Sequence, residues 1–181
     1  MGFPCNWKDA DGVAAMRDFL RQPPPRKAAI RDLMTELLSP TPYARRCAAD
    51  LARRVSAREP GILGRYAGVL IDLVAELPPE QWQARGYTAL AAALNASARA
   101  ERMRLAPLVR AMVEDERNAV RAIALEAFAI LAVAEPELRE EVMVLLEQAR
   151  REGTCAMRSR ARRMLPALLS TELKARPGKR G

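Results

Sequence analysis

The chain of 181 residues contains no histidine, three cysteines and only 4% aromatic residues. Without histidine, Ser–His and Cys–His nucleophilic pairs and His-ligated metal sites are excluded. The cysteines lie far apart, form no CxxC pair and are odd in number, which favours reduced thiols over a disulfide framework. Because no catalytic, cofactor-binding or metal-ligating motif is visible in the sequence, we expect a non-catalytic protein without a cofactor or a bound metal.

Long apolar runs are also missing from the sequence. The longest, at 122–134, still contains Glu126 and is shorter than the roughly 20 residues that cross a bilayer. The N-terminus lacks the apolar segment of an export signal. We therefore expect a cytoplasmic protein with no membrane insertion, and the excess of arginine over lysine is typical of a GC-rich bacterial genome.

A spacing pattern recurs along most of the chain. Five segments carry a small residue, then an apolar residue four positions later and another four after that. They are Gly12/Met16/Leu20, Cys47/Leu51/Val55, Gly86/Leu90/Leu94, Ala124/Phe128/Ala132 and Ala161/Leu165/Leu169. The small residues follow one another at steps of 35, 39, 38 and 37 residues. A period of this length on helical spacing predicts stacked helical hairpins, and hence an all-α protein built as an α-solenoid.

Apolar stripes and prolines divide the chain into about four and a half hairpins. Prolines at the first helical position sacrifice no hydrogen bond, so Pro42, Pro60, Pro79 and Pro136 predict helix starts. We expect first helices at 9–21, 42–56, 79–96, 117–134 and 155–170, and second helices at 24–38, 60–77, 100–114 and 136–152. In the helix 60–77, the stripe Tyr66, Val69, Leu70 and Leu73 predicts the buried face. Residues 1–170 would form one repeat domain, and 171–181 a basic, disordered tail.

Two segments add a more specific pattern. Asp115 is followed by Val120-Arg121, then by Ala124 and Phe128, and Met157-Arg158 is followed in the same way by Ala161 and Leu165. This pattern resembles the HEAT repeat, although the second and third hairpins carry Ala44 and Gln83 where the family has arginine. The resemblance implies a right-handed α-α superhelix whose second helices line the concave surface. It also implies that Arg121 and Arg158 are structural repeat arginines, joined in a ladder to the turn aspartate.

Charge is concentrated at one end of the chain. Residues 1–149 hold 20 basic and 20 acidic residues, whereas residues 150–181 hold 10 basic residues against Glu152 and Glu172. A candidate surface for an anionic partner therefore combines basic residues of the third hairpin and the last helix. Its members are Arg102, Arg104, Arg158, Arg160, Arg162 and Arg163. The alternative is a solvated cap on the terminal repeat.

These observations favour a scaffold that binds a protein partner of unknown identity. The alternative is a nucleic-acid-binding, DNA-repair-type HEAT-like protein that uses the basic residues of the third hairpin and last helix. Acidic residues dominate 135–152, so no continuous track for phosphates is expected. The last helix has no partner helix of its own, so Leu165, Leu168 and Leu169 are expected to dock on the preceding pair, with a homo-dimer through this helix as the other possibility.

Overall fold

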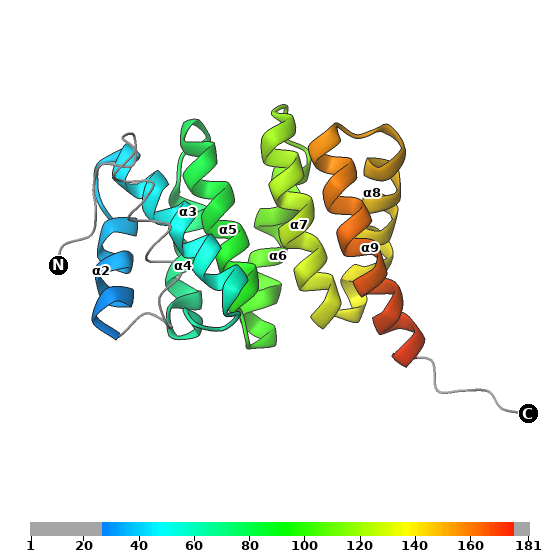
Figure 1. Cartoon of the computed structure of the whole chain (residues 1–181), viewed down its shortest axis with the longest axis horizontal. Coiled ribbons are helices and arrows are strands. Elements are labelled where there is room, and N and C mark those ends of the chain that lie inside the picture. The colour runs from blue at the N-terminus through cyan, green and yellow to red at the C-terminus, as the bar shows by residue number, and fades with distance from the viewer. Residues whose placement is uncertain (1–26, 176–181) are drawn as a thin grey trace, which may run out of the picture. The chain divides into compact units, whose positions relative to one another are not determined.

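The computed structural model describes residues 27–175, with the backbone alone for residues 171–175. Every element in this range is a helix (Figure 1), which confirms the all-α prediction. The expected first helix at 9–21 lies outside the described residues, as does the end of the expected tail at 176–181.

The helices form two compact units, which meet in the sequence between Ser97 and Ala98. The N-terminal unit contains α2 (Lys27–Leu37), α3 (Pro42–Arg58), the 3-10 turn η1 (Gly64–Tyr66), α4 (Ala67–Glu76), η2 (Pro79–Gln81) and α5 (Trp82–Asn95). The C-terminal unit contains α6 (Arg99–Val113), α7 (Asn118–Ala134), η3 (Pro136–Leu138), α8 (Arg139–Glu152) and α9 (Cys155–Ala175). The single repeat domain expected over residues 1–170 stays a prediction.

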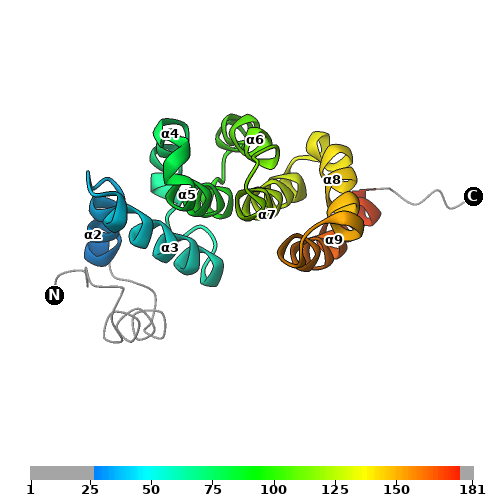
Figure 2. The same ribbon diagram turned by 90° about the horizontal axis from the view of Figure 1, so that it is seen from above.

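Each unit packs its helices in the same way. In the N-terminal unit α3 lies against α5, with α2 packed on α3 and α4 packed on α5. In the C-terminal unit α7 lies against α9, α6 packs on α7, and α8 packs on both α7 and α9. Figure 2 shows α6 and α8 on one side of this unit and α7 and α9 on the other. Helices one repeat apart in the sequence are therefore neighbours within a unit.

The small residue of each described repeat is buried. Cys47 on α3 and Gly86 on α5 are buried, and Ala124 on α7 and Ala161 on α9 have no exposed surface. A small side chain lets two helices approach closely, and the larger apolar residues four positions later are also buried: Leu51, Leu90, Phe128 and Leu165. The repeat spacing thus marks the packed face of the first helices. Burial also raises the pKa of the Cys47 thiol, as expected for a cysteine used as a small apolar residue.

Helix starts agree with the prolines except at one place. α3 begins at Pro42, and Pro79 and Pro136 begin the short turns η2 and η3 that lead into α5 and α8. The prediction for Pro60 was wrong: it lies in a turn, and α4 begins only at Ala67. The physical reason is Gly61, whose φ of 87° is compatible with a turn and incompatible with a right-handed helix.

The late start of α4 also changes its buried face. Ala67, Leu70, Ile71 and Val74 are buried, whereas Val69 is 39% exposed. The predicted stripe had included Val69, so the observed stripe is rotated around the helix by about one position. Leu70 and Leu73, which were predicted to be buried, are buried.

A buried asparagine fixes the turn before α4. The Asn95 side-chain oxygen accepts the backbone N–H of Leu63 at 2.7 Å, and its amide nitrogen donates to the Ser56 hydroxyl and the Ala91 carbonyl, both at 2.7 Å. Asn95 is 2% exposed. Because a buried polar group without partners is costly, this one side chain holds together α3, the turn and α5.

The last helix docks on the pair of helices that precedes it, as expected. Leu165 and Leu168 of α9 are 6% and 0% exposed. The prediction for Leu169 was wrong: it is 44% exposed, because it lies one position around the helix from the buried Leu168. The helix continues to Ala175, five residues into the region expected to be a disordered tail. The homo-dimer through this helix stays a prediction.

We expect Asn95→Ala to lower the free energy of unfolding by about 2–3 kcal/mol, because it leaves the buried Leu63 N–H without an acceptor. Urea unfolding followed by circular dichroism measures the change. The matched control is Asn118→Ala on exposed α7 surface, which should stay within about 0.5 kcal/mol of the unchanged protein. Equal losses in the two variants would show that the Asn95 network does not hold the turn.

Candidate binding surfaces

Arginines of α6 are paired with carboxylates of the following hairpin. Arg102 Nε lies 2.7 Å from Glu135 Oε1, and the Glu135 side chain is 4% exposed. Arg99 reaches the same carboxylate at 3.3 Å and Glu137 at 2.8 Å. Removing both arginines would leave the buried Glu135 carboxylate uncompensated, so these pairs fix the position of the turn before α8.

A second pair joins α6 to α8. Both oxygens of Glu141 accept hydrogen bonds from Arg110, each at 2.6 Å, and the guanidinium lies over the Phe128 ring at 5.5 Å from its centre. The hydrogen bonds from Arg110 hold the pKa of the Glu141 carboxyl below its usual value. Bidentate geometry is the strongest form of this interaction, so Arg110 is also engaged inside the unit.

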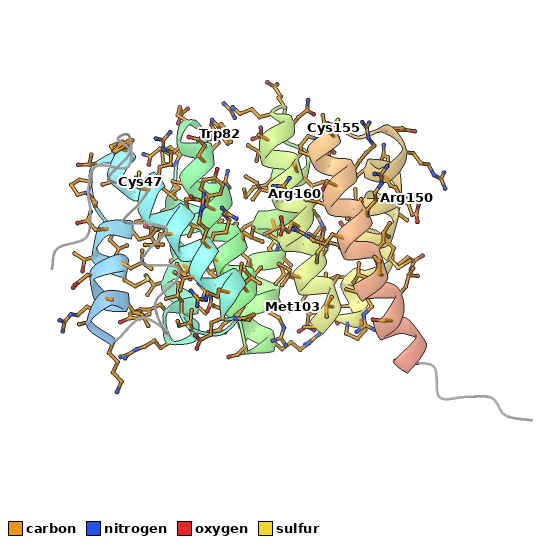
Figure 3. The ribbon with its side chains drawn as sticks, viewed as in Figure 1. Cys47, Trp82, Met103, Arg150, Cys155 and Arg160 are labelled. Atoms are coloured by element: carbon orange, nitrogen blue, oxygen red, sulfur yellow. The ribbon has the colours of Figure 1, made fainter. Side chains whose placement is uncertain are left out.

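On the opposite layer, one carboxylate holds two arginines of the candidate surface. Arg160 Nε donates to Glu126 Oε2 at 3.0 Å, and Arg163 Nη2 donates to the other oxygen of Glu126. Figure 3 labels Arg160, whose side chain on α9 meets this glutamate of α7. The pairing therefore neutralises part of the positive charge that the sequence places on the last helix.

In the N-terminal unit, arginines also reach the following repeat, but there they donate to neutral glutamine side chains. From α3, Arg45 donates to Gln81 at 2.5 Å and Arg46 donates to Gln83 at 3.1 Å. The guanidinium of a third arginine, Arg53, lies 5.1 Å from the centre of the Tyr87 ring. Arginines that reach the following repeat are thus a property of both units.

The six residues of the candidate anionic-partner surface divide between two layers. Arg102 and Arg104 lie on α6, whereas Arg158, Arg160, Arg162 and Arg163 lie on α9, and Figure 2 shows these helices on different sides of the unit. Arg102, Arg160 and Arg163 are ion-paired, and Arg104 is exposed. The structure therefore does not gather the six side chains into one patch.

A smaller basic surface remains on α9. A shallow hollow of about 500 Å³ is lined by Cys155, Arg158, Ser159, Arg162 and Arg163. Arg162 is exposed and, among the described residues, has no ion pair. Cys155, labelled in Figure 3, is an exposed thiol at the start of the helix.

The two structural repeat arginines have different surroundings. Arg158 donates to the Gly153 carbonyl oxygen at 2.6 Å and contacts Cys155 Sγ at 3.3 Å, which ties α9 to the turn that precedes it. Arg121 is not paired with the turn aspartate, because Asp115 accepts hydrogen bonds from Arg117 instead. The Nε atom of Arg121 is buried and, in the described part of the chain, has no hydrogen-bond partner.

Arg121 lies in the wall of a cleft within the C-terminal unit. The cleft encloses about 330 Å³ between the ends of α6 and α8 and the starts of α7 and α9. Its lining includes Asn118, Gln148 and Glu152, which the sequence did not single out. No motif marks these residues, because the cleft forms only through the packing of four helices.

Comparison of the chain with known proteins identifies no family: no family model, curated protein or solved structure matches it. Within residues 27–175, no cluster of three or more cysteine, aspartate or glutamate residues is arranged to hold a metal ion. None of the helices described is both long and apolar enough to cross a membrane.

The contrast between the two repeat arginines gives a matched pair of substitutions. Arg158→Met should lower the free energy of unfolding by about 1 kcal/mol, because a charged hydrogen bond to a backbone carbonyl is lost. Arg121→Met should change it by less than about 0.5 kcal/mol or stabilise the chain, since it removes a buried donor that has no acceptor. Urea unfolding checks both, and an equal loss in the two variants would assign them the same structural role.

Proposed function

We propose that this chain is a cytoplasmic, non-catalytic HEAT-like α-solenoid that acts as a scaffold for a protein partner. The observation that carries the proposal is the engagement of its arginines by its own carboxylates. Arg102, Arg110, Arg160 and Arg163 all bind glutamates of a neighbouring repeat. A surface of paired, alternating charge suits a protein partner better than a polyanion, which needs unpaired cations.

The solenoid itself is supported by how repeats pack within each unit. α3 packs on α5 and α7 packs on α9, and the small residue of each described repeat is buried. Each hairpin buries its apolar face against the next one, which is the packing logic of solenoid proteins. The arginine contacts that join successive repeats, in both units, add support for a repeating unit of this length.

One exposed apolar residue on α8, Val144, lies among charged residues and supplies contact area. Val144 is 64% exposed on this second helix, and Glu140 one turn before it is also exposed. Protein interfaces combine apolar contacts with a polar rim, so a face of this kind is suited to a protein partner. In the proposed solenoid, second helices line the concave surface, and α8 would contribute to it.

Nucleic-acid binding is the second candidate, and one observation favours it. The hollow on α9 presents Arg158 and Arg162 beside Ser159 without a carboxylate in its lining. Phosphate oxygens are good acceptors for such arginines. Glu126 already holds Arg163 on the same helix, so few cations are available for a long polyanion.

Affinity capture with the tagged full chain, in cells of its own organism, tests the scaffold. We expect a defined protein in constant ratio to the chain, which stays bound after nuclease treatment. Val144→Asp should reduce the captured amount, because it places a charge in the apolar contact. Leu38→Asp, at a residue 56% exposed in the N-terminal unit, is the matched control and should leave capture unchanged. Capture of no protein, or of nucleic acid released by nuclease, would contradict the scaffold.

Salt dependence separates the two candidates. Each neutralised phosphate of duplex DNA gives a slope of about −0.9 in log K against log salt. We expect fluorescence anisotropy to show weak, sequence-indifferent binding at low salt, which disappears at physiological salt and on deletion of residues 176–181. Tight binding at physiological salt that survives this deletion, but is lost in Arg158→Gln/Arg162→Gln, would make nucleic-acid binding the better account.

A further inference from the structure

The Arg121 cleft combines an apolar wall with a few polar groups. It is lined by Val113, Asn118, Arg121, Leu125, Leu145, Gln148, Ala149, Glu152, Gly153, Thr154 and Met157. A volume of about 330 Å³ is at the lower end of the range for ligand sites, and holds about one amino-acid residue. All of the lining belongs to the C-terminal unit, so the cleft is defined by contacts within one compact body.

Arg121 lines this cleft, and its Nε–H group has no hydrogen-bond acceptor in the described part of the chain. Its Nε atom is buried from solvent and has no acceptor, and none of the described carboxylates is ion-paired with it. A buried donor without an acceptor is costly, and the cost is higher for a charged group. The acceptor with the best match to a guanidinium is a carboxylate or a phosphate, because either can accept two parallel hydrogen bonds.

The other polar residues limit which anion fits. Glu152 lines the same cleft and would repel a dianion such as a phosphate monoester. Its carboxylate accepts a hydrogen bond from the Gln148 side-chain amide at 3.5 Å and has further lone pairs for an N–H group of the ligand. Asn118 and Gln148 carry amide groups at the rim, and side-chain amides can both donate to and accept from a peptide backbone.

One chemical group satisfies all of these features together. The C-terminal residue of a peptide has a carboxylate for Arg121, a backbone N–H for Glu152 and an apolar side chain for the wall formed by Leu125, Leu145 and Met157. Recognition of a C-terminal carboxylate is an established mode of peptide binding in proteins. A fatty acid lacks the N–H group, and a folded domain is too large for the cleft.

We propose that the Arg121 cleft binds the C-terminal residue of the protein partner, with its carboxylate on Arg121 and an apolar side chain against Leu125, Leu145 and Met157. This inference rests on the proposed scaffold function and names the part of the partner that is recognised. Arg121 is then a binding residue, whereas Arg158 at the same position of the next repeat is structural.

NMR titration of the isotope-labelled full chain tests the proposal with three synthetic probes. The first is a short peptide of glycine and serine that ends in leucine with a free carboxylate; the second is the same peptide as the C-terminal amide, and the third is free leucine. We expect saturable shifts at the backbone amides of Asn118, Arg121 and Gln148 with the acid peptide. The amide peptide should bind at least about tenfold more weakly, because it carries no negative charge to pair with the guanidinium.

Variants of the full chain separate binding from folding. Arg121→Gln should weaken the acid peptide about tenfold and leave the amide peptide unaffected, because only the acid presents a carboxylate to the guanidinium. Arg117→Gln, a nearby arginine outside the cleft, is the matched control and should change neither affinity. Arg121→Lys keeps the charge and should retain part of the binding, which distinguishes a lost contact from a lost fold.

Three results would overturn the proposal: equal affinities for the acid and amide peptides, equal effects of Arg121→Gln and Arg117→Gln, or saturation by free leucine with no response to the peptide. Affinity capture with the Arg121→Gln variant in place of the unchanged chain then tests the cleft separately from the scaffold. A partner held equally by this variant contradicts the cleft and leaves the scaffold standing. Failure of the unchanged chain to capture any protein contradicts the scaffold, whatever the peptide result.

Discussion

Helices of successive repeats can approach closely only where the side chains between them are small, and the other contacts in each unit depend on this steric condition. Ala124 on α7 and Ala161 on α9 have no exposed surface, and these two helices pack on each other. Close approach brings long side chains of one helix within reach of the next, so Arg160 can bind Glu126. A larger residue at the small position would separate the helices and weaken both the apolar packing and the polar contacts between repeats.

Ion pairs within the C-terminal unit occupy arginines that contribute to the positive net charge of the sequence. The sequence places its excess of positive charge in the last repeat and tail, which indicates an anionic partner. In the structure, Glu126 holds two arginines of that repeat and Glu135 holds Arg102 of the third hairpin. Ion pairs of α6 and α9 join residues 31 to 38 positions apart, so a count of charges along the chain cannot reveal them. Acidic residues of 135–152, which disfavour a polyanion, also act as partners of arginines within the unit.

Helix content and the packed face of the first helices could be predicted because both depend on local spacing. Pro42 begins a helix as expected, and the small residue of each described repeat is buried. The start of α4 could not be predicted from proline alone, since the positive φ of Gly61 and the hydrogen bonds of Asn95 decide it. The side chain of Asn95 binds a residue 32 positions earlier, and sequence periodicity carries no information about such a contact. The Arg121 cleft escaped prediction for the same reason, because its lining comes from the ends of separate helices.

Arg121 and Arg158 show that an equivalent position in a repeat does not imply an equivalent role. Both follow an apolar residue and precede a small one, and the HEAT resemblance assigns both to the scaffold. Arg158 binds the carbonyl of Gly153 in the turn before its helix, whereas Asp115, in the corresponding turn before α7, is taken by Arg117. Arg121 has no such contact: its Nε is buried without a hydrogen-bond partner, and none of the described carboxylates is ion-paired with it. Because Arg121 lines the cleft, a carboxylate that enters there can pair with its guanidinium, and the apolar wall beside Arg121 favours a carboxylate attached to an apolar side chain.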